Sequence, residues 1–69
     1  MKKTSIEKII KIVKDFGKVI EITMLSGTTL EIFDVNLCDF LDDDTLKVEC
    51  KDGVKWLSIE KIESIHYII

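Results

Sequence analysis

Proline and arginine are absent from the sequence, and cysteine and histidine are scarce, with two cysteines and one histidine. Arginine is the residue best suited to bidentate recognition of phosphate and guanine, so its absence weighs against sequence-specific nucleic-acid binding. Two cysteines are too few for the disulfide framework of a small secreted domain, and we expect both to be free thiols.

Long apolar runs are also missing. No segment approaches the ~18 consecutive apolar residues that a membrane span needs. Charged residues interrupt the N-terminal region at Glu7, Lys8 and Lys11, where a signal peptide would have its apolar core. We therefore expect a cytoplasmic location and no membrane contact.

The residues that catalysis requires are equally sparse. His66 has no serine or cysteine motif near it with which to form a nucleophile–base pair. Cys38, Cys50 and His66 lack the paired spacing of structural zinc ligands. We therefore expect no enzymatic activity, no cofactor and no metal site.

What the sequence has in abundance is apolar residues. They make up 46% of 69 residues, twelve of them isoleucine, and the mean hydropathy is +0.20. A chain of this length forms a single domain, here 1–69, and buries only about 60% of the surface that its unfolded form exposes. The excess of apolar residues therefore predicts a homo-oligomer.

The first part of the sequence has the pattern of an amphipathic helix at about 5–16. Thr4 and Glu7 fit a capping box, and Gly17 is a typical C-terminal stop. One helical face carries the apolar residues Ile6, Ile9, Ile10, Val13 and Phe16.

From about residue 18 to residue 69 the apolar residues recur with a period of two, which predicts strands. Turns are expected at Ser26-Gly27 and, as a type I′ hairpin, at Asp52-Gly53. Residues 35–41 are extended but less regular, at a point where a long strand would bend. Residues 58–62 are short enough for one helical turn. We predict an α+β, mainly β domain, in which five antiparallel strands close into an SH3-like small barrel behind the helix.

The net charge of −3 is unevenly distributed, with +4 over residues 1–18 and −7 over residues 19–69. The predicted helix carries a lysine face, which suits sequence-independent contact with phosphates but is also what any solvated amphipathic helix shows. Aromatic side chains later in the chain can stack on bases or anchor a core or interface. The candidate RNA- or nucleotide-binding residues are Lys8, Lys11, Lys14, Trp56 and Tyr67, with Lys2, Lys3 and Lys18 on the same lysine-rich segment.

Acidic residues cluster around one predicted loop, at Asp39, Asp42, Asp43 and Asp44. Their spacing is not that of a calcium-binding loop. They form either a solvated acidic loop or a surface for a basic protein partner, such as a nucleic-acid-handling enzyme. An acidic protein-interaction or inhibitor module is therefore the alternative to a nucleotide-binding one.

The order of elements, the Ser26-Gly27 turn and the closing repeat of Ile59, Ile62 and Ile65 resemble the Sm-like family, which includes the bacterial Hfq proteins. Gly27 matches the family's first turn glycine, and Asp39 its loop aspartate. The resemblance implies a small barrel, assembly into a ring and RNA binding. The sequence departs from the family at Ile32, where a second glycine would stand.

The departure is larger at residues 58–60. Ser58, Ile59 and Glu60 replace the Tyr-Lys-His of Hfq, so the resemblance does not extend to uridine-binding chemistry.

Overall fold

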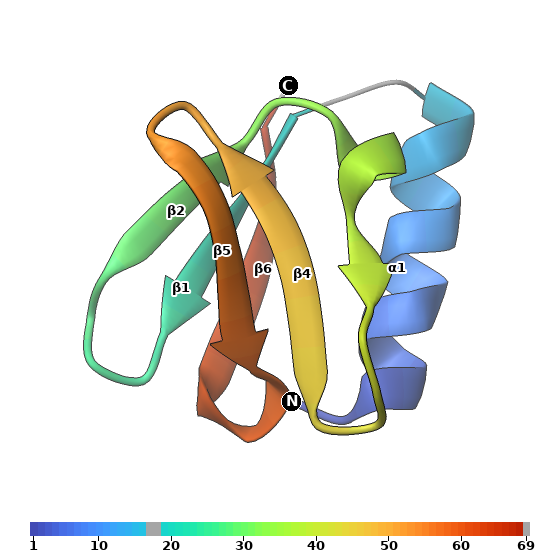
Figure 1. The fold of residues 1–69 in the computed structure, drawn as a ribbon. Coiled ribbons are helices and arrows are strands. Elements are labelled where there is room, and N and C mark those ends of the chain that lie inside the picture. The colour runs from blue at the N-terminus through green and yellow to red at the C-terminus, as the bar shows by residue number, and fades with distance from the viewer. Residues whose placement is uncertain (17–18, 69) are drawn as a thin grey trace.

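The computed structural model describes residues 1–16 and 19–68, which form one helix, six strands and two 3-10 turns (Figure 1). Gly17, predicted to end the helix, and Lys18 and Ile69, predicted at the ends of the strand region, lie outside the described residues. The elements are α1 (Lys3–Phe16), β1 (Val19–Met24), β2 (Thr29–Ile32), η1 (Val35–Leu37), β3 (Asp39–Phe40), β4 (Thr45–Cys50), β5 (Gly53–Ser58), η2 (Ile59–Lys61) and β6 (Ile62–Ile68).

Helix α1 was predicted correctly but begins two residues before the expected start. The carbonyl of Lys2 accepts a hydrogen bond from the amide of Ile6 at 3.1 Å, so Lys2 is the N-cap of the helix. The prediction that Thr4 is the N-cap was therefore wrong. Tertiary contacts hold these additional residues at the start of the helix. The Met1 nitrogen donates to the Ile62 carbonyl at 2.7 Å, and the Lys3 amine donates to Asp43.

The strands form two antiparallel sheets of three, with the orders β2-β1-β6 and β3-β4-β5. The domain is thus α+β and mainly β, as predicted. Among residues 19–68, no hydrogen-bonded ladder joins the two sheets into a closed barrel, and the predicted five-stranded barrel is not confirmed.

The break between the sheets lies in the region predicted to be extended. Asp34 accepts the amide of Asn36 at 2.9 Å and caps the 3-10 turn η1, so the expected strand is reduced to the two residues of β3. A short side chain that bonds to nearby backbone competes with strand pairing in this way. The prediction of an extended segment at 35–37 was therefore wrong.

Both predicted hairpins are present, but the β4–β5 turn lies one residue earlier than the predicted Asp52-Gly53 turn. Gly27 has φ +91° in the β1–β2 turn, and its amide donates to the Met24 carbonyl. In the β4–β5 hairpin Cys50 pairs with Gly53, which leaves Lys51 and Asp52 as the two loop residues. Only Gly53 has positive φ there, so the turn is not type I′. The predicted single helical turn at 58–62 is the 3-10 turn η2.

The core lies between the two sheets and α1. The helix buries Ile6, Ile10 and Val13, and β1 contributes Ile20 and Ile22. The remaining buried apolar residues are Ile32, Val35, Cys38, Leu46, Val48, Leu57, Ile59 and Ile62. Within the described part of the chain, no helix has the length and hydropathy needed to cross a membrane.

Candidate functional site

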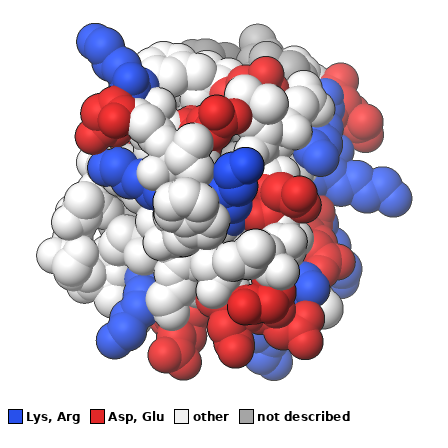
Figure 2. Space-filling model, in the orientation of Figure 1, with Lys and Arg blue, Asp and Glu red and all other residues white. Residues whose placement is uncertain are grey.

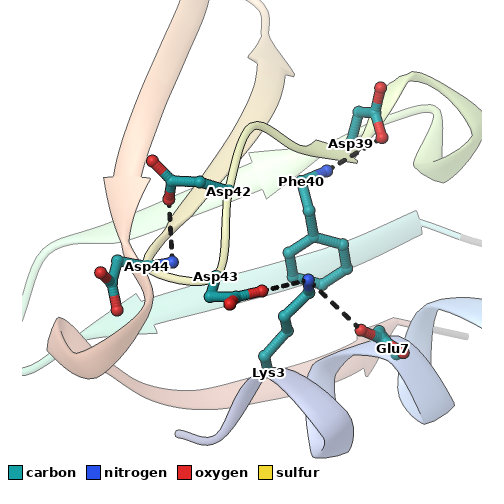
Figure 3. Close-up of polar contacts among 7 residues, drawn as sticks. All are labelled: Lys3, Glu7, Asp39, Phe40, Asp42, Asp43 and Asp44. Carbon is teal, nitrogen blue, oxygen red and sulfur yellow. Dashed lines mark hydrogen bonds and ion pairs between the residues drawn. The ribbon is translucent and has the colours of Figure 1, made fainter.

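The four aspartates predicted to meet a basic partner lie on and after β3, with Asp39 apart from the other three, and three of the four accept hydrogen bonds within the chain (Figure 3). Asp39 accepts the amide of Phe40 at 2.9 Å, and Asp42 accepts the amide of Asp44 at 2.8 Å. Asp43 accepts a hydrogen bond from the Lys3 amine at 2.9 Å. These carboxylates therefore shape the loop and fasten it to α1.

Lys3 holds this loop against the helix. Its amine lies 3.9 Å from a Glu7 carboxylate oxygen and 5.1 Å from the centre of the Phe40 ring, a cation–π distance. The hydrogen bond to Asp43 raises the pKa of Lys3, and the same bond lowers the pKa of Asp43. Figure 2 shows that lysines are interspersed among acidic side chains over this face of the molecule.

The predicted lysine face of α1 is divided between two environments. Lys11 and Lys14 line a groove of about 240 Å³ between α1 and β3, together with Glu7 and Asp39. Their positive charges therefore stand beside carboxylates. Lys8 is exposed on a different side of the helix and is not part of this groove.

Trp56 lies on the outer face of the β3-β4-β5 sheet, with 59% of its surface exposed. Trp56 on β5 pairs across the sheet with Lys47 on the central strand β4. Lys47 in turn pairs with Asp39 on β3. Lys11, Lys14 and Trp56 thus belong to one surface that runs from α1 across this sheet. Lys47 was not predicted from the sequence, because its position beside Trp56 depends on the strand register.

Tyr67 lies elsewhere. It lines a groove of about 440 Å³ between α1 and the β2-β1-β6 sheet, whose other walls are entirely apolar: Ile9, Ile12, Val13, Phe16, Ile20 and Ile65. The structure therefore does not bring Tyr67 together with Trp56. Ile12 and Phe16 are 58% and 64% exposed, and the sequence interpretation did not identify Ile12. The helical spacing of Ile9, Ile12 and Phe16, a second stripe beside the buried one, is the signal that it missed.

The remaining reactive groups are separate from one another. Cys38 and Cys50 are free thiols, one buried and one half-buried, and burial raises the pKa of Cys38 to about 11. His66 is exposed on β6 opposite Glu21 of β1. Across residues 1–16 and 19–68, no three acidic, cysteine or histidine side chains are grouped closely enough to hold a metal ion.

Two surfaces therefore stand out: the outer sheet surface around Trp56, and the apolar groove beside α1. No protein-family model matches the sequence, and neither the curated proteins nor the solved structures contain a match to this chain.

Proposed function

We propose that the chain is a non-catalytic binding module that works as a homo-oligomer. The observation that carries this proposal is the number of large apolar side chains left exposed outside a core of thirteen buried residues. Three of them, Ile12, Phe16 and Tyr67, line one apolar groove, and a contiguous exposed apolar patch is typical of an interaction site. The side chains, each at least 37% exposed, are Ile12, Phe16, Leu25, Phe33, Leu37, Leu41, Val54, Trp56 and Tyr67.

The strand order supports an Sm-like small barrel as the finer description of the fold. Strands β2 and β3 are consecutive in the chain, and β6 returns to pair with β1. Each sheet contains a hairpin of consecutive strands, β1–β2 and β4–β5, and the last strand lies beside the first, an arrangement from which small barrels are built. The edge strands are β2 and β6 in one sheet and β3 and β5 in the other.

Light scattering on the purified chain tests self-association. We expect a mass that is a multiple of the 7.9 kDa chain at tens of micromolar. A mass of one chain throughout this range would contradict the proposal.

As ligand we propose RNA or a nucleotide, bound on the outer face of the β3-β4-β5 sheet. Trp56 would stack on a base, and Lys47, Lys11 and Lys14 would contact phosphate. The support is the exposure of Trp56 and its pairing with Lys47. A basic protein partner for the aspartate loop has less support, because three of the four carboxylates accept hydrogen bonds within the chain.

Trp56 is the only tryptophan, so its fluorescence reports on this surface directly. We expect mixed oligonucleotides and nucleotides to quench it at low salt, and quenching to weaken as salt is raised. Lys47→Glu should lose the effect, whereas Lys61→Glu, a matched charge reversal on η2, should keep it. Absence of quenching at low salt would contradict a nucleic-acid ligand and leave self-association unaffected.

A further inference from the structure

Helix α1 has a second apolar stripe that the core does not use. Ser5, Ile9, Ile12 and Phe16 follow one another at spacings of four, three and four, the repeat of a coiled-coil seam. Ile9 is half-buried against the core, whereas Ile12 and Phe16 are 58% and 64% exposed. Its apolar members Ile9, Ile12 and Phe16 line the 440 Å³ groove beside β6.

Opposite charges border this stripe on its solvent side. Lys8 and Asp15 are both exposed and lie seven residues apart, which places them on the same side of the helix. At 1.5 Å of rise per residue they are about 10.5 Å apart along the axis, too far to pair with each other. Both occupy the heptad position that meets its equivalent in an antiparallel pair of helices.

We propose that α1 pairs antiparallel with α1 of a second copy of this chain, across this stripe. This inference rests on the self-association proposed above, and it assigns α1 as the surface through which two copies associate. A two-fold axis between the helices places Lys8 of each copy beside Asp15 of the other, so that two reciprocal ion pairs form.

The apolar residues of the stripe fit the same register. Ile9 of each copy faces Ile12 of the other, and the bulky Phe16 faces the small Ser5. Large residues opposite small ones allow helices to interdigitate closely. The second helix also covers the groove, including Ile65 and Tyr67 at its floor. The stripe is therefore complementary to itself in size and in charge.

Exchanging the charges of Lys8 and Asp15 tests the antiparallel register. The dimer is measured by sedimentation equilibrium on the full chain. Lys8→Asp and Asp15→Lys should each weaken the dimer by about tenfold or more, because each places like charges together at both reciprocal positions. The double variant, which restores opposite charges in exchanged positions, should recover the dimer to within about threefold of the unmodified chain.

Ile12→Glu should leave only single chains at tens of micromolar while the circular dichroism spectrum stays that of the folded chain, because Ile12 lies outside the core. Leu25→Glu is the matched control, since Leu25 is 60% exposed but lies on the β1–β2 turn, and it should leave the dimer intact.

An oligomer that survives both Ile12→Glu and the single charge reversals would overturn the α1 pairing and support self-association by another surface, such as a ring formed through strand edges. A chain that is monomeric without any substitution would overturn both proposals.

Discussion

Cys38 lies in the core with 6% of its surface exposed, whereas Cys50, at the end of β4, is half-buried. The thiolate is the reactive form of cysteine, and burial raises the pKa of Cys38 from 9.0 to about 11. Burial also raises the pKa of Cys50, in a more accessible position. The two thiols therefore differ in reactivity because their burial differs, and the sequence pattern alone does not give this difference.

We expect an aromatic disulfide reagent at neutral pH to modify Cys50 first and Cys38 only as the fold opens. The variant Cys50→Ser should retain one thiol, which reacts slowly in buffer and at once in denaturant. Equal rates for the two thiols in the folded chain would show that Cys38 is not in the core.

The pair between Lys3 and Asp43 gives a pH dependence of definite sign. Because Lys3 lowers the pKa of Asp43 below 3.8, the carboxylate stabilises the fold above that pH. This stabilisation is lost as the pH falls below 3.8 and through the pKa of the folded state. We expect Asp43→Asn to be less stable than the unmodified chain at neutral pH, with the difference closing on acidification.

Denaturant unfolding at several pH values measures this difference. Asp44→Asn is the matched control, because it removes a charge from the same loop without touching the pair with Lys3. A constant difference between Asp43→Asn and the unmodified chain from pH 7 to below 3.8 would contradict the role of the pair.

At the scale of elements, α1 is held by one face only. Ile6 is fully buried among core residues, whereas Ile12 on the same helix is mostly exposed. We expect Ile6→Ala to destabilise the fold by about 2–5 kcal/mol, and Ile12→Ala to change the stability of the single chain by less than about 0.5 kcal/mol. Chemical denaturation at low protein concentration measures both, and comparable losses would mean that the faces of α1 are assigned wrongly.

The β4–β5 hairpin depends on the backbone of Gly53, whose φ is +132°. A side chain there meets open space, so any cost of substitution comes from backbone conformation alone. We expect Gly53→Ala to lower the free energy of unfolding by about 1 kcal/mol or more, and Lys51→Ala in the same turn to have little effect. Equal stabilities of the two variants would indicate that the turn relaxes without strain.

The elements differ in how well the sequence predicts them. β4 was evident because Leu46 and Val48 alternate with charged residues and do face the core. The segment around η1 was not, because Asp34 forms a local hydrogen bond that a period-two pattern does not register. The start of α1 was also misplaced, since Lys3 bonds to Asp43 and the preceding Met1 bonds to Ile59 of η2 and Ile62 of β6, which are distant in sequence.

At the scale of the whole molecule, the candidate sites were predictable as residue types but not as groupings. Trp56 and Tyr67 look equivalent in the sequence, yet Trp56 faces outward from its sheet and Tyr67 faces the groove beside α1. The face of each strand that packs inward is given by the structure: Leu57, next to Trp56, is buried, and Tyr67 pairs with the buried Ile20. Charge spacing on α1, by contrast, is readable from the sequence alone.

Self-association follows from the balance between the length of the chain and its apolar content. A chain of 69 residues has room for one small core, and here that core leaves Phe16, Leu41 and Trp56 each more than half exposed. A partner that covers such side chains stabilises the folded state by mass action. We therefore expect the thermal midpoint to rise with protein concentration.

Small-angle X-ray scattering over a concentration series is the decisive measurement of self-association, because it reports mass and dimensions together. The single chain has a Cα radius of gyration of 10.7 Å and extents of 26 × 25 × 18 Å. We expect the forward scattering to correspond to more than one chain at tens of micromolar, with a radius of gyration clearly above that of the single chain. Scattering that matches one chain at every concentration would contradict self-association.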